Sequence, residues 1–269
     1  MTKKTINVVV TGSRGYVGKT FVETARQRDD VDIQIYEFNT DNYTDGNLFY
    51  DDWCDWMDSV ASITVDYVLH LGAISDSTYT NPDIVFANGL ACKIIGRYAA
   101  HAAHKNADTE TKVIYFSSCS AINPMTLYGW SKVVGESELG NMISPNNLCI
   151  LRPFNIYGGD ESEKRNPSIV WKFQHNKAVR VFMHCLRDFV HVDDVCAAVL
   201  SLMIEKWQHG RYELGTGKAV SMEALWSAYV DEYPPLEARP ENVAEKLKAR
   251  KDRMLKGFYC KRDVLDAKY

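Results

Sequence analysis

The sequence predicts an α/β fold built on a doubly wound parallel sheet. A short apolar run, Val8–Val10, enters a turn that holds Gly12, Gly15 and Gly18, and a helical pattern follows at once. Further short apolar runs alternate with helical patterns along the chain, which is typical of parallel sheets covered by helices. With 269 residues, 46% of them hydrophobic, the chain can bury a substantial core.

Composition excludes several classes of partner. The formal charge of -4 comes without a basic cluster, so we expect no nucleic-acid or anionic-membrane partner. The seven cysteines form no CxxC pair and no metal-ligand spacing, which predicts reduced thiols and no metal site. The start of the chain lacks the apolar region of a signal peptide, and no run reaches the ~18 apolar residues of a membrane span. We therefore expect a soluble, cytoplasmic protein.

The glycine turn has the residue types of a phosphate cradle. Gly12 can take the tight turn, Gly15 lets backbone approach a ligand, and Gly18 lets the helix pack on the strand. The helix start then leaves N–H groups for a pyrophosphate, which predicts dinucleotide binding. The alternative is a glycine-bearing loop of some other α/β protein, because the spacing is GxxGxxG and not GxGxxG.

The second apolar run, 31–38, ends near an acid. Glu37 lies about 20 residues beyond the glycine turn, where a ribose-binding carboxylate belongs. It could accept hydrogen bonds from the adenosine 2′-hydroxyl and would repel a 2′-phosphate, which favours NAD over NADP. Arg14 in the glycine turn argues the other way. The alternative for Glu37 is a solvated carboxylate at a strand end.

The next segments continue the alternation. Residues 41–58 are polar, aromatic and poorly periodic, so we expect a loop with a short helix. Residues 65–73 predict a buried strand that ends in small residues, which leave room for a cofactor. His70 in this run is expected to be a core histidine with one ring nitrogen satisfied. Residues 82–104 predict a helix whose apolar face is wider than one sheet contact requires.

A tyrosine and a lysine follow the strand predicted at 112–116. Tyr128 and Lys132 stand at i and i+4 of a helix and share a face. The ammonium is expected to lower the pKa of the phenol, making Tyr128 an acid/base group, while a serine at the strand end holds the substrate oxygen. Taken alone, the pair is more often an ordinary surface pair. Its position after a serine-ended strand favours the chemical role.

The second half of the chain is less informative. Residues 148–152 predict another strand, and the guanidinium of Arg187 could bind a phosphate through two N–H groups. Ser221 is expected to cap a helix that runs to Tyr233. The charged stretch 236–256 is expected to be helical.

The ordered set TGSRGYVG, HLGA, YGWSK, RPFNIYGG, RDFVHVDD and YELGTG resembles the extended short-chain dehydrogenase/reductases, in particular the NAD-dependent epimerase/dehydratase family acting on nucleotide sugars. The match runs from about residue 6 to 217. It implies a Rossmann-type NAD-binding domain at 1–152 and a small C-terminal substrate-binding lobe at 153–269, from which about 187–206 return to the first domain. The run HLGAISDST and Lys164 look most like the ADP-heptose 6-epimerases.

The resemblance also implies roles for single residues. Catalysis would fall to Ser118, Tyr128 and Lys132. The substrate would contact Ser75, Asn155, Lys164 and Arg187. NAD, with NADP less expected, would contact Gly12, Arg14, Gly15, Tyr16, Val17, Gly18, Glu37, Asn47, Leu48, Leu71, Gly72, Ala73 and Lys132. The helices at 82–104 and 128–141 would pair with their copies in a homodimer.

Two departures from the family pattern leave alternatives open. The segment before Tyr128 is about a dozen or more residues shorter than usual, and the C-terminal lobe ends early. The shortening leaves Ser117 as an alternative to Ser118, and Cys119 as a possible second acid/base group or a small buried side chain. Cys119 and Ser120 occupy the places of the acid pair that dehydratases need, which disfavours dehydration. An epimerase is favoured, before a reductase or epimerase-reductase and a non-catalytic nucleotide-binding protein.

Overall fold

The chain forms two compact units in a computed structural model. Unit one comprises Met1–Arg152 and Val199–Arg211, and unit two comprises Pro153–Ala198 and Tyr212–Tyr269. The structure describes residues 3–41, 46–60, 62–76, 78–105, 110–161, 167–175, 177, 181–182, 185–230, 236–237 and 246–265. Of these, only the backbone is described at 46–49, 101–105, 181–182, 236–237 and 246–247.

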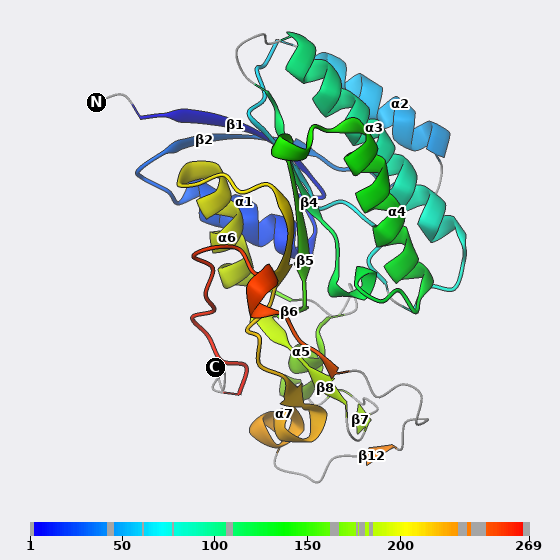
Figure 1. Ribbon diagram of the computed structural model, residues 1–269, viewed down its shortest axis with the longest axis vertical. Helices are drawn as coiled ribbons and strands as arrows, with labels where there is room; N and C mark the ends of the chain where they lie inside the picture. The colour runs from blue at the N-terminus through cyan, green and yellow to red at the C-terminus, as the bar shows by residue number, and fades with distance from the viewer. Residues whose placement is uncertain are drawn as a thin grey trace. The chain divides into compact units, whose positions relative to one another are not determined.

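Unit one is organised around a sheet whose strand order, over the described residues, is β10-β5-β4-β3-β1-β2 (Figure 1). The pairs of β1 with β2 and β3, of β3 with β4, and of β4 with β5 are parallel. Thr11 aligns with both Phe38 and His70, so the carboxyl ends of the central strands share one edge. The strands are β1 (Thr5–Thr11), β2 (Asp32–Phe38), β3 (Tyr67–His70), β4 (Lys112–Phe116), β5 (Leu148–Pro153) and β10 (Gly210–Leu214).

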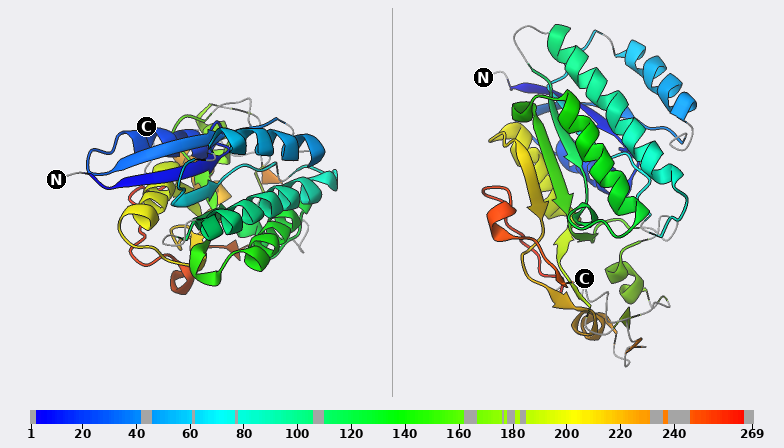
Figure 2. Two further views of the ribbon diagram at one scale, coloured as in Figure 1. Left: turned by 90° about the horizontal axis from the view of Figure 1, so that it is seen from above. Right: turned by 45° about the vertical axis from the view of Figure 1, so that its right-hand side comes forward.

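Helices cover both faces of this sheet, as Figure 2 shows. On one face lie α2 (Gly46–Ser59), α3 (Asp83–Lys105) and α4 (Leu127–Met142), and on the other lies α1 (Tyr16–Arg26). Buried side chains of β1, β3 and β4 pack with α2, α3 and α4 in one apolar cluster. The doubly wound α/β fold that the sequence predicts is confirmed.

Glycines let α3 and α4 approach each other closely. A Cβ atom on Gly89 would lie 2.7 Å from Val134, and one on Gly96 would lie 3.0 Å from the sulfur of Met142. The two helices therefore run parallel in register, and α4 covers part of the wide apolar face of α3. Both helices lie where the sequence predicts them.

Residues 41–58 differ from their prediction as a loop with a short helix. From Gly46 the backbone forms the 14-residue helix α2. Its Trp53 ring packs edge-on against Phe38 at 4.7 Å between centroids and against Tyr98 of α3 at 5.7 Å. Aromatic packing of this kind stabilises a helix whose own periodicity is weak.

Unit two is built from short strands. The strand β6 (Asn155–Tyr157) pairs in parallel with β9 (Phe189–His191). The strand β8 (Leu186–Arg187) pairs with β11 (Val220–Ser221) and β13 (Lys246–Leu247), and β7 (Val181–Phe182) pairs with β12 (Leu236–Glu237). The helices are α5 (Ile169–Gln174), α7 (Met222–Tyr229) and the first part of α6 (Val192–Ile204). Unit one includes the later part of α6, from Val199.

The end of unit two corrects one prediction and confirms another. The stretch expected to be a charged helix at 236–256 contains β12, β13 and the 3₁₀ turn η5 (Lys251–Arg253) in its described parts. Pairing of β13 with β8 supplies backbone hydrogen bonds that a helix would have made internally. Ser221 caps α7 as predicted, because its hydroxyl accepts a hydrogen bond from the amide of Ala224 at 3.0 Å.

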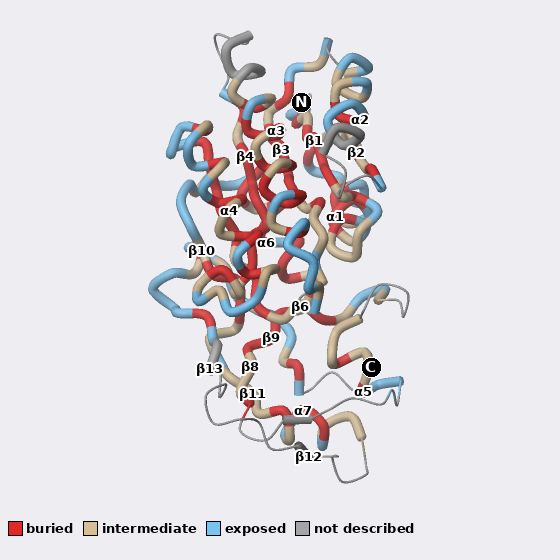
Figure 3. Tube along the Cα trace, turned by 90° about the vertical axis from the view of Figure 1, so that its right-hand side faces the viewer, coloured by how far each residue is buried: buried red, intermediate tan, exposed pale blue. Residues whose placement is uncertain are grey.

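Burial follows the sheet of unit one. Figure 3 shows buried residues running along β1, β3 and β4. The last four residues of β1, all four of β3 and all of β4 after Lys112 are buried. All seven cysteines are thiols, as the sequence predicts. Among the helices in the described part of the chain, none is long and apolar enough to span a bilayer.

Candidate active site

Backbone crowding explains two glycines of the turn that follows β1. Gly12 has φ +70°, and a Cβ atom there would lie 2.7 Å from Cα of Gly72 in the loop after β3. A Cβ atom on Gly18 would collide with the carbonyl oxygen of Gly12. Gly15 donates its amide to the same carbonyl at 2.9 Å and is the N-cap of α1. The first N–H groups of α1 therefore lie directly after a turn that no larger residue could form.

The remaining residues expected in the pyrophosphate cradle lie at this helix start. Tyr16 and Val17 are the first residues of α1. Arg14 lies in the turn before them; its amide donates to Oδ1 of Asn39 at 3.1 Å. Its guanidinium is 60% exposed and 4.0 Å from the carboxylate of Asp41. Arg14 is thus available to an anion at the surface of the turn.

Glu37 is near the carboxyl end of β2 and is held by two side chains. Its Oε2 accepts a hydrogen bond from the hydroxyl of Ser13 at 2.6 Å, and its Oε1 accepts one from Arg26 at 2.8 Å. Asn39 donates to the same Ser13 hydroxyl at 2.7 Å. Each carboxylate oxygen can accept two hydrogen bonds, so capacity remains for ribose hydroxyls. Ser13 and Asn39 could not be predicted from the sequence, because their roles follow only from the approach of β2 to the glycine turn.

The loop after β3 is tied to β1 and to α3. Leu71 donates its amide to the carbonyl of Thr11 at 3.2 Å, and Gly72 donates to the hydroxyl of Thr11 at 3.2 Å. Gly72 is buried and Ala73 is partly buried, so small residues line the loop beside Gly12. Ser75, expected to contact substrate, lies exposed in the same loop.

His70 is a core histidine, as the sequence predicts. It is 1% exposed, its ring stacks on Tyr115 at 5.4 Å, and its Nδ1 is 2.7 Å from the hydroxyl of Thr11. Burial, and to a smaller extent the charge of Lys132, lowers the pKa of His70 to about 3. The imidazole is therefore neutral at physiological pH.

Three residues meet where β4 ends against the start of α4. The phenol of Tyr128 lies within reach of the Ser118 side chain, and the amine of Lys132 is 5.8 Å from the centre of the Tyr128 ring. The same amine donates to the carbonyl of Phe116 at 2.9 Å and is almost fully buried. Thr126 caps α4 by accepting from the amide of Gly129 at 3.1 Å. The helix start therefore holds the phenol beside Ser118.

The expected lowering of the pKa of Tyr128 by Lys132 is wrong for this structure. Burial raises the pKa of Tyr128 to about 12; the hydrogen bond with Ser118 lowers it by less, and the charge of Cys119 raises it further. Burial also lowers the pKa of Lys132 to about 8, although the nearby Cys92 and Glu136 raise it. Desolvation by burial is the largest influence on the pKa of both groups.

The two candidate serines point to different partners. The hydroxyl of Ser117 donates to Oε1 of Glu136 at 2.6 Å and is buried. The hydroxyl of Ser118 accepts from the amide of Ser120 at 3.1 Å and contacts Tyr128. Cys119 opens the 3₁₀ turn η1 (Cys119–Ala121) and is partly exposed. The structure thus brings Ser118, and not Ser117, to the phenol.

In unit two, Asn155 on β6 and Arg187 on β8 both adjoin Asp188, whose carboxylate is buried. The side chain of Asn155 donates to the carbonyl oxygen of Asp188 at 2.7 Å. The Asp188 carboxylate accepts hydrogen bonds from the amides of Thr216 and Gly217, each at 2.8 Å, and of Ala249 at 2.9 Å. Asp188 stands within the RDFVHVDD motif but was not singled out from the sequence. Its role depends on Thr216 and Ala249, which are distant in the chain.

Some predicted contacts lie outside what the structure describes. Lys164 is outside the described residues, and the side chains of Asn47 and Leu48 at the start of α2 are likewise not described. These assignments stay predictions.

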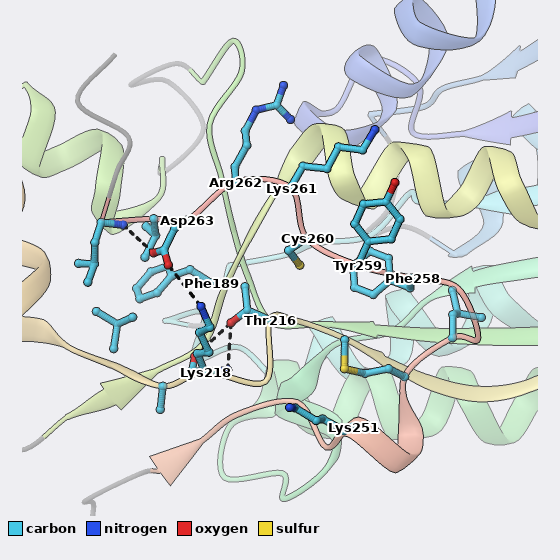
Figure 4. A pocket seen from close by; sticks show the side chains of 16 residues that line it. Phe189, Thr216, Lys218, Lys251, Phe258, Tyr259, Cys260, Lys261, Arg262 and Asp263 are labelled. Carbon is cyan, nitrogen blue, oxygen red and sulfur yellow. Dashed lines mark hydrogen bonds and ion pairs between the residues drawn. The ribbon is translucent and has the colours of Figure 1, made fainter.

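Unit two also contains a pocket of about 810 Å³ beside the segment 251–265 (Figure 4). Its lining mixes the rings of Phe189, Phe258 and Tyr259 with basic side chains. Lys218 pairs with Asp263 at 3.7 Å, as the dashed line in Figure 4 marks. The positive charge of the pocket lining is therefore partly neutralised by Asp263.

A parallel sheet with a glycine turn after its first strand, and a serine, tyrosine and lysine where a later strand meets a helix, define a protein of the NAD(P)-dependent short-chain dehydrogenase/reductase class. The model of the NAD dependent epimerase/dehydratase family matches residues 8–215 of the chain. The chain therefore belongs to this family of enzymes, which use NAD(P) to modify nucleotide sugars.

Solved structures share the fold at low identity. The Bordetella bronchiseptica enzyme WbmG in complex with NAD is 18% identical, with a TM-score of 0.72 over 98% of this chain and 91% of that one. The dTDP-4-dehydrorhamnose reductase of Bacillus anthracis in complex with NADP is 16% identical, with a TM-score of 0.68 over 93% and 88%. The UDP-N-acetylglucosamine 4-epimerase of Bacillus cereus is 17% identical, with a TM-score of 0.63 over 97% and 96%.

Proposed function

We propose that the protein is an NAD-dependent epimerase of a nucleotide sugar. The observation that carries the proposal is the contact of Ser118 with Tyr128, one helical turn before the buried Lys132. It supplies a proton-transfer group, a hydroxyl that can hold the substrate oxygen, and a cation beside the phenol. The raised pKa of Tyr128 means that the phenol must be activated before it can act as a base.

The residues of the glycine turn fit a dinucleotide. Gly12 and Gly18 occupy places where a Cβ atom would strike backbone, and the N-terminus of α1 lies between them. Glu37, near the carboxyl end of β2, accepts a hydrogen bond from Ser13 of the same turn. NAD, when bound, accepts and returns a hydride, and its oxidised ring adds a positive charge. A positive charge lowers the pKa of a nearby phenol, in the same direction as the Ser118 hydrogen bond.

The reaction then follows from the chain's own groups. Tyr128 as phenolate removes the proton of a sugar hydroxyl while the hydride leaves the same carbon, and a ketone forms. The ketone turns, or loses and regains a proton at the carbon beside the carbonyl, before the hydride returns and Tyr128 gives its proton back. Ser118 donates a hydrogen bond to the reacting oxygen throughout, and no net redox change results.

Glu37 supports NAD over NADP. Its carboxylate stands where the adenosine ribose is expected, and a 2′-phosphate would meet a negative charge there. Arg14 and Arg26 are the nearby cations that count in the other direction. Calorimetric titration of both cofactors tests this; NADP binding tenfold tighter, about 1.4 kcal/mol, would overturn it.

A second candidate is a reductase or epimerase-reductase. Cys119 directly follows Ser118, is partly exposed and influences the charge state of Tyr128, so it could serve as another acid/base group. A third is a protein that binds nucleotides without catalysis, which the shortened segment before Tyr128 favours. The buried Lys132 beside the phenol counts against it, because a buried cation is costly to keep without a role.

The substrate is expected to contact Ser75, Asn155, Lys164 and Arg187. The closer resemblance to ADP-heptose 6-epimerases gives ADP-sugars as the first substrates to try. One screen separates the candidates: incubation with ADP-, UDP-, GDP- and dTDP-sugars, products read by NMR and cofactor absorbance followed in parallel. An epimerase changes the sugar without net cofactor consumption, a reductase consumes reduced cofactor stoichiometrically, and a binding protein does neither.

A homodimer through α3 and α4 belongs to the same proposal. Phe86 on α3 is 66% exposed and Trp130 on α4 is 52% exposed, and the glycine contacts set these two residues at one level of the parallel helix pair. Exposed aromatic side chains together are typical of an interface. A monomer at micromolar concentration by light scattering would refute the dimer.

A further inference from the structure

Glu136 is a buried carboxylate that the proposed mechanism does not use. Its side chain is 4% exposed, and it lies on α4 four residues after Lys132 and eight after Tyr128. Residues at this spacing share one face of a helix. Burying a charge is costly unless charged partners and hydrogen bonds satisfy it, so the partners of Glu136 indicate what it holds in place.

Those partners lie on β5, on β10 and directly after β4. Oε1 of Glu136 accepts from the hydroxyl of Ser117 at 2.6 Å and from Nε of Arg152 at 2.8 Å. Oε2 accepts from Nη2 of Arg152 at 2.7 Å and is 3.0 Å from Nε of Arg211. A two-pronged guanidinium contact fixes orientation as well as distance. One carboxylate thereby joins α4 to the end of β4, to β5 and to β10.

Three successive residues at the end of β4 each contact a different turn of α4. The carbonyl of Phe116 accepts from Lys132 at 2.9 Å, Ser117 contacts Glu136, and Ser118 contacts Tyr128. The backbone at Ser118 is extended, with φ -159° and ψ 154°. Successive side chains of extended backbone point in opposite directions. Holding Ser117 on Glu136 therefore turns Ser118 toward the phenol.

We propose that Glu136 is a positioning residue for the proposed site of Ser118, Tyr128 and Lys132. It holds the end of β4 in place and fixes the rotation of α4 about its axis, so that Ser118 meets the phenol. This role rests on the proposed function, because the residues it positions are those assigned to catalysis. Glu136 would act through its partners Ser117, Arg152 and Arg211.

The charge of Glu136 gives the role a separate signature. The groups that face the Lys132 amine are Glu136 and Tyr128 on α4, Cys92 on α3, Tyr115 on β4 and His70 on β3. Glu136 and Cys92 raise the pKa of Lys132, which burial lowers to about 8. Removing the negative charge of Glu136 therefore shifts the titration of Lys132 to lower pH.

The test compares Glu136→Gln, Glu136→Asp and the control Glu138→Gln in the full-length protein. Glu138 is a matched control for Glu136, because it lies two residues further along α4 and carries the same charge. The Lys132 titration is followed by NMR of ¹³Cε-labelled lysine, with the signal assigned through Lys132→Met. Glu136→Gln should lower the midpoint by about half a pH unit or more, whereas Glu138→Gln should leave it in place.

Activity is measured on the nucleotide sugar that the parent converts in the screen. Glu136→Asp keeps the charge but cannot reach Ser117 and Arg152 together, so kcat should fall about tenfold or more with KM little changed. A folded Glu136→Gln with an unmoved Lys132 midpoint overturns the proposal, as does Glu136→Asp with parental kcat. If Glu136→Gln fails to fold by circular dichroism, Glu136→Asp decides. A parent that converts no sugar refutes the proposed function instead, and the lysine titration still tests Glu136.

Discussion

The two units hold their predicted functional groups in different ways. In unit one, Tyr128, Lys132 and Glu136 repeat along one helix face and contact successive residues at the end of β4. In unit two, short strands and turns gather on a single buried carboxylate, Asp188, which accepts hydrogen bonds from segments around Thr216 and Ala249.

The two arrangements should respond differently to the loss of one polar side chain. A repeated helix-to-strand contact distributes its support, so the loss of one polar group should change the chemistry of unit one more than its fold. In unit two, Asp188 accepts from backbone amides of two distant segments, which cannot turn to other partners as side chains can, so its loss should loosen unit two as a whole.

The largest expected effect is that of Tyr128→Phe. Removing the hydroxyl leaves the ring to pack and leaves Lys132 bonded to the carbonyl of Phe116, so folding and NAD affinity should change little. General acid/base groups contribute ~10²–10⁴-fold, so kcat should fall at least about a hundredfold with KM little changed. Tyr50→Phe, on the exposed surface of α2, is the control. More than about a tenth of parental kcat in Tyr128→Phe would remove the proposed mechanism.

Asp188→Asn should act on stability instead. The amide nitrogen replaces an oxygen that accepts two hydrogen bonds, which leaves buried N–H groups unsatisfied. The free energy of unfolding should fall by about 2–4 kcal/mol, with faster hydrogen exchange confined to unit two. Asp193→Asn is the control, because Asp193 is 43% exposed and its pair with Arg262 should contribute less than about 1 kcal/mol. Equal effects of the two variants would contradict the central role of Asp188.

His70 predicts a dependence of stability on pH that belongs to unit one. Its folded pKa of about 3 lies below the unfolded value of about 6.5, so between these values the unfolded state binds the extra proton. The stability that neutral His70 provides is complete above about pH 6.5 and is lost as pH falls. Relative to His70→Gln, the parent should lose about 2 kcal/mol between pH 7 and pH 5 in urea titrations. Identical slopes for both proteins would contradict the burial argument.

The smallest expected effect comes from the glycine turn. Gly18→Ala places a methyl group against the carbonyl of Gly12, and the turn must shift by an amount that should cost about 1–3 kcal/mol and weaken NAD about tenfold. Gly140→Ala is a matched control, because no atom lies within 4 Å of its added carbon. It should gain about 0.5–1 kcal/mol from helix propensity and leave NAD binding unchanged, as calorimetry can measure. Equal NAD affinity of the two variants would show that the turn does not cradle the cofactor.

Short-range rules explain what the sequence predicted well. Turns that need glycine, the alternation of strands with helices, and the i to i+4 spacing of Tyr128 and Lys132 depend on residues close in the chain. The fold class, the core position of His70, the cap at Ser221 and the helices α3 and α4 were therefore predictable, and the structure confirms them. The catalytic and binding roles stay predictions.

Long-range packing explains what the sequence did not predict. The helix α2 depends on Phe38 and Tyr98, and the strand β13 depends on its pairing with β8. Neither contact leaves a local pattern, because the residues that meet are far apart in the chain.

The sequence by itself determined the family, the parallel α/β fold and the residue types available for proton transfer, since these follow from motifs and local spacing. Only the tertiary structure decided that Ser118 meets Tyr128, that Ser117 turns to Glu136, and that the pKa of the phenol rises. The physical reason is that the direction of a side chain and its desolvation depend on which distant segments surround it, and these are fixed only when strand, helix and buried charges pack together.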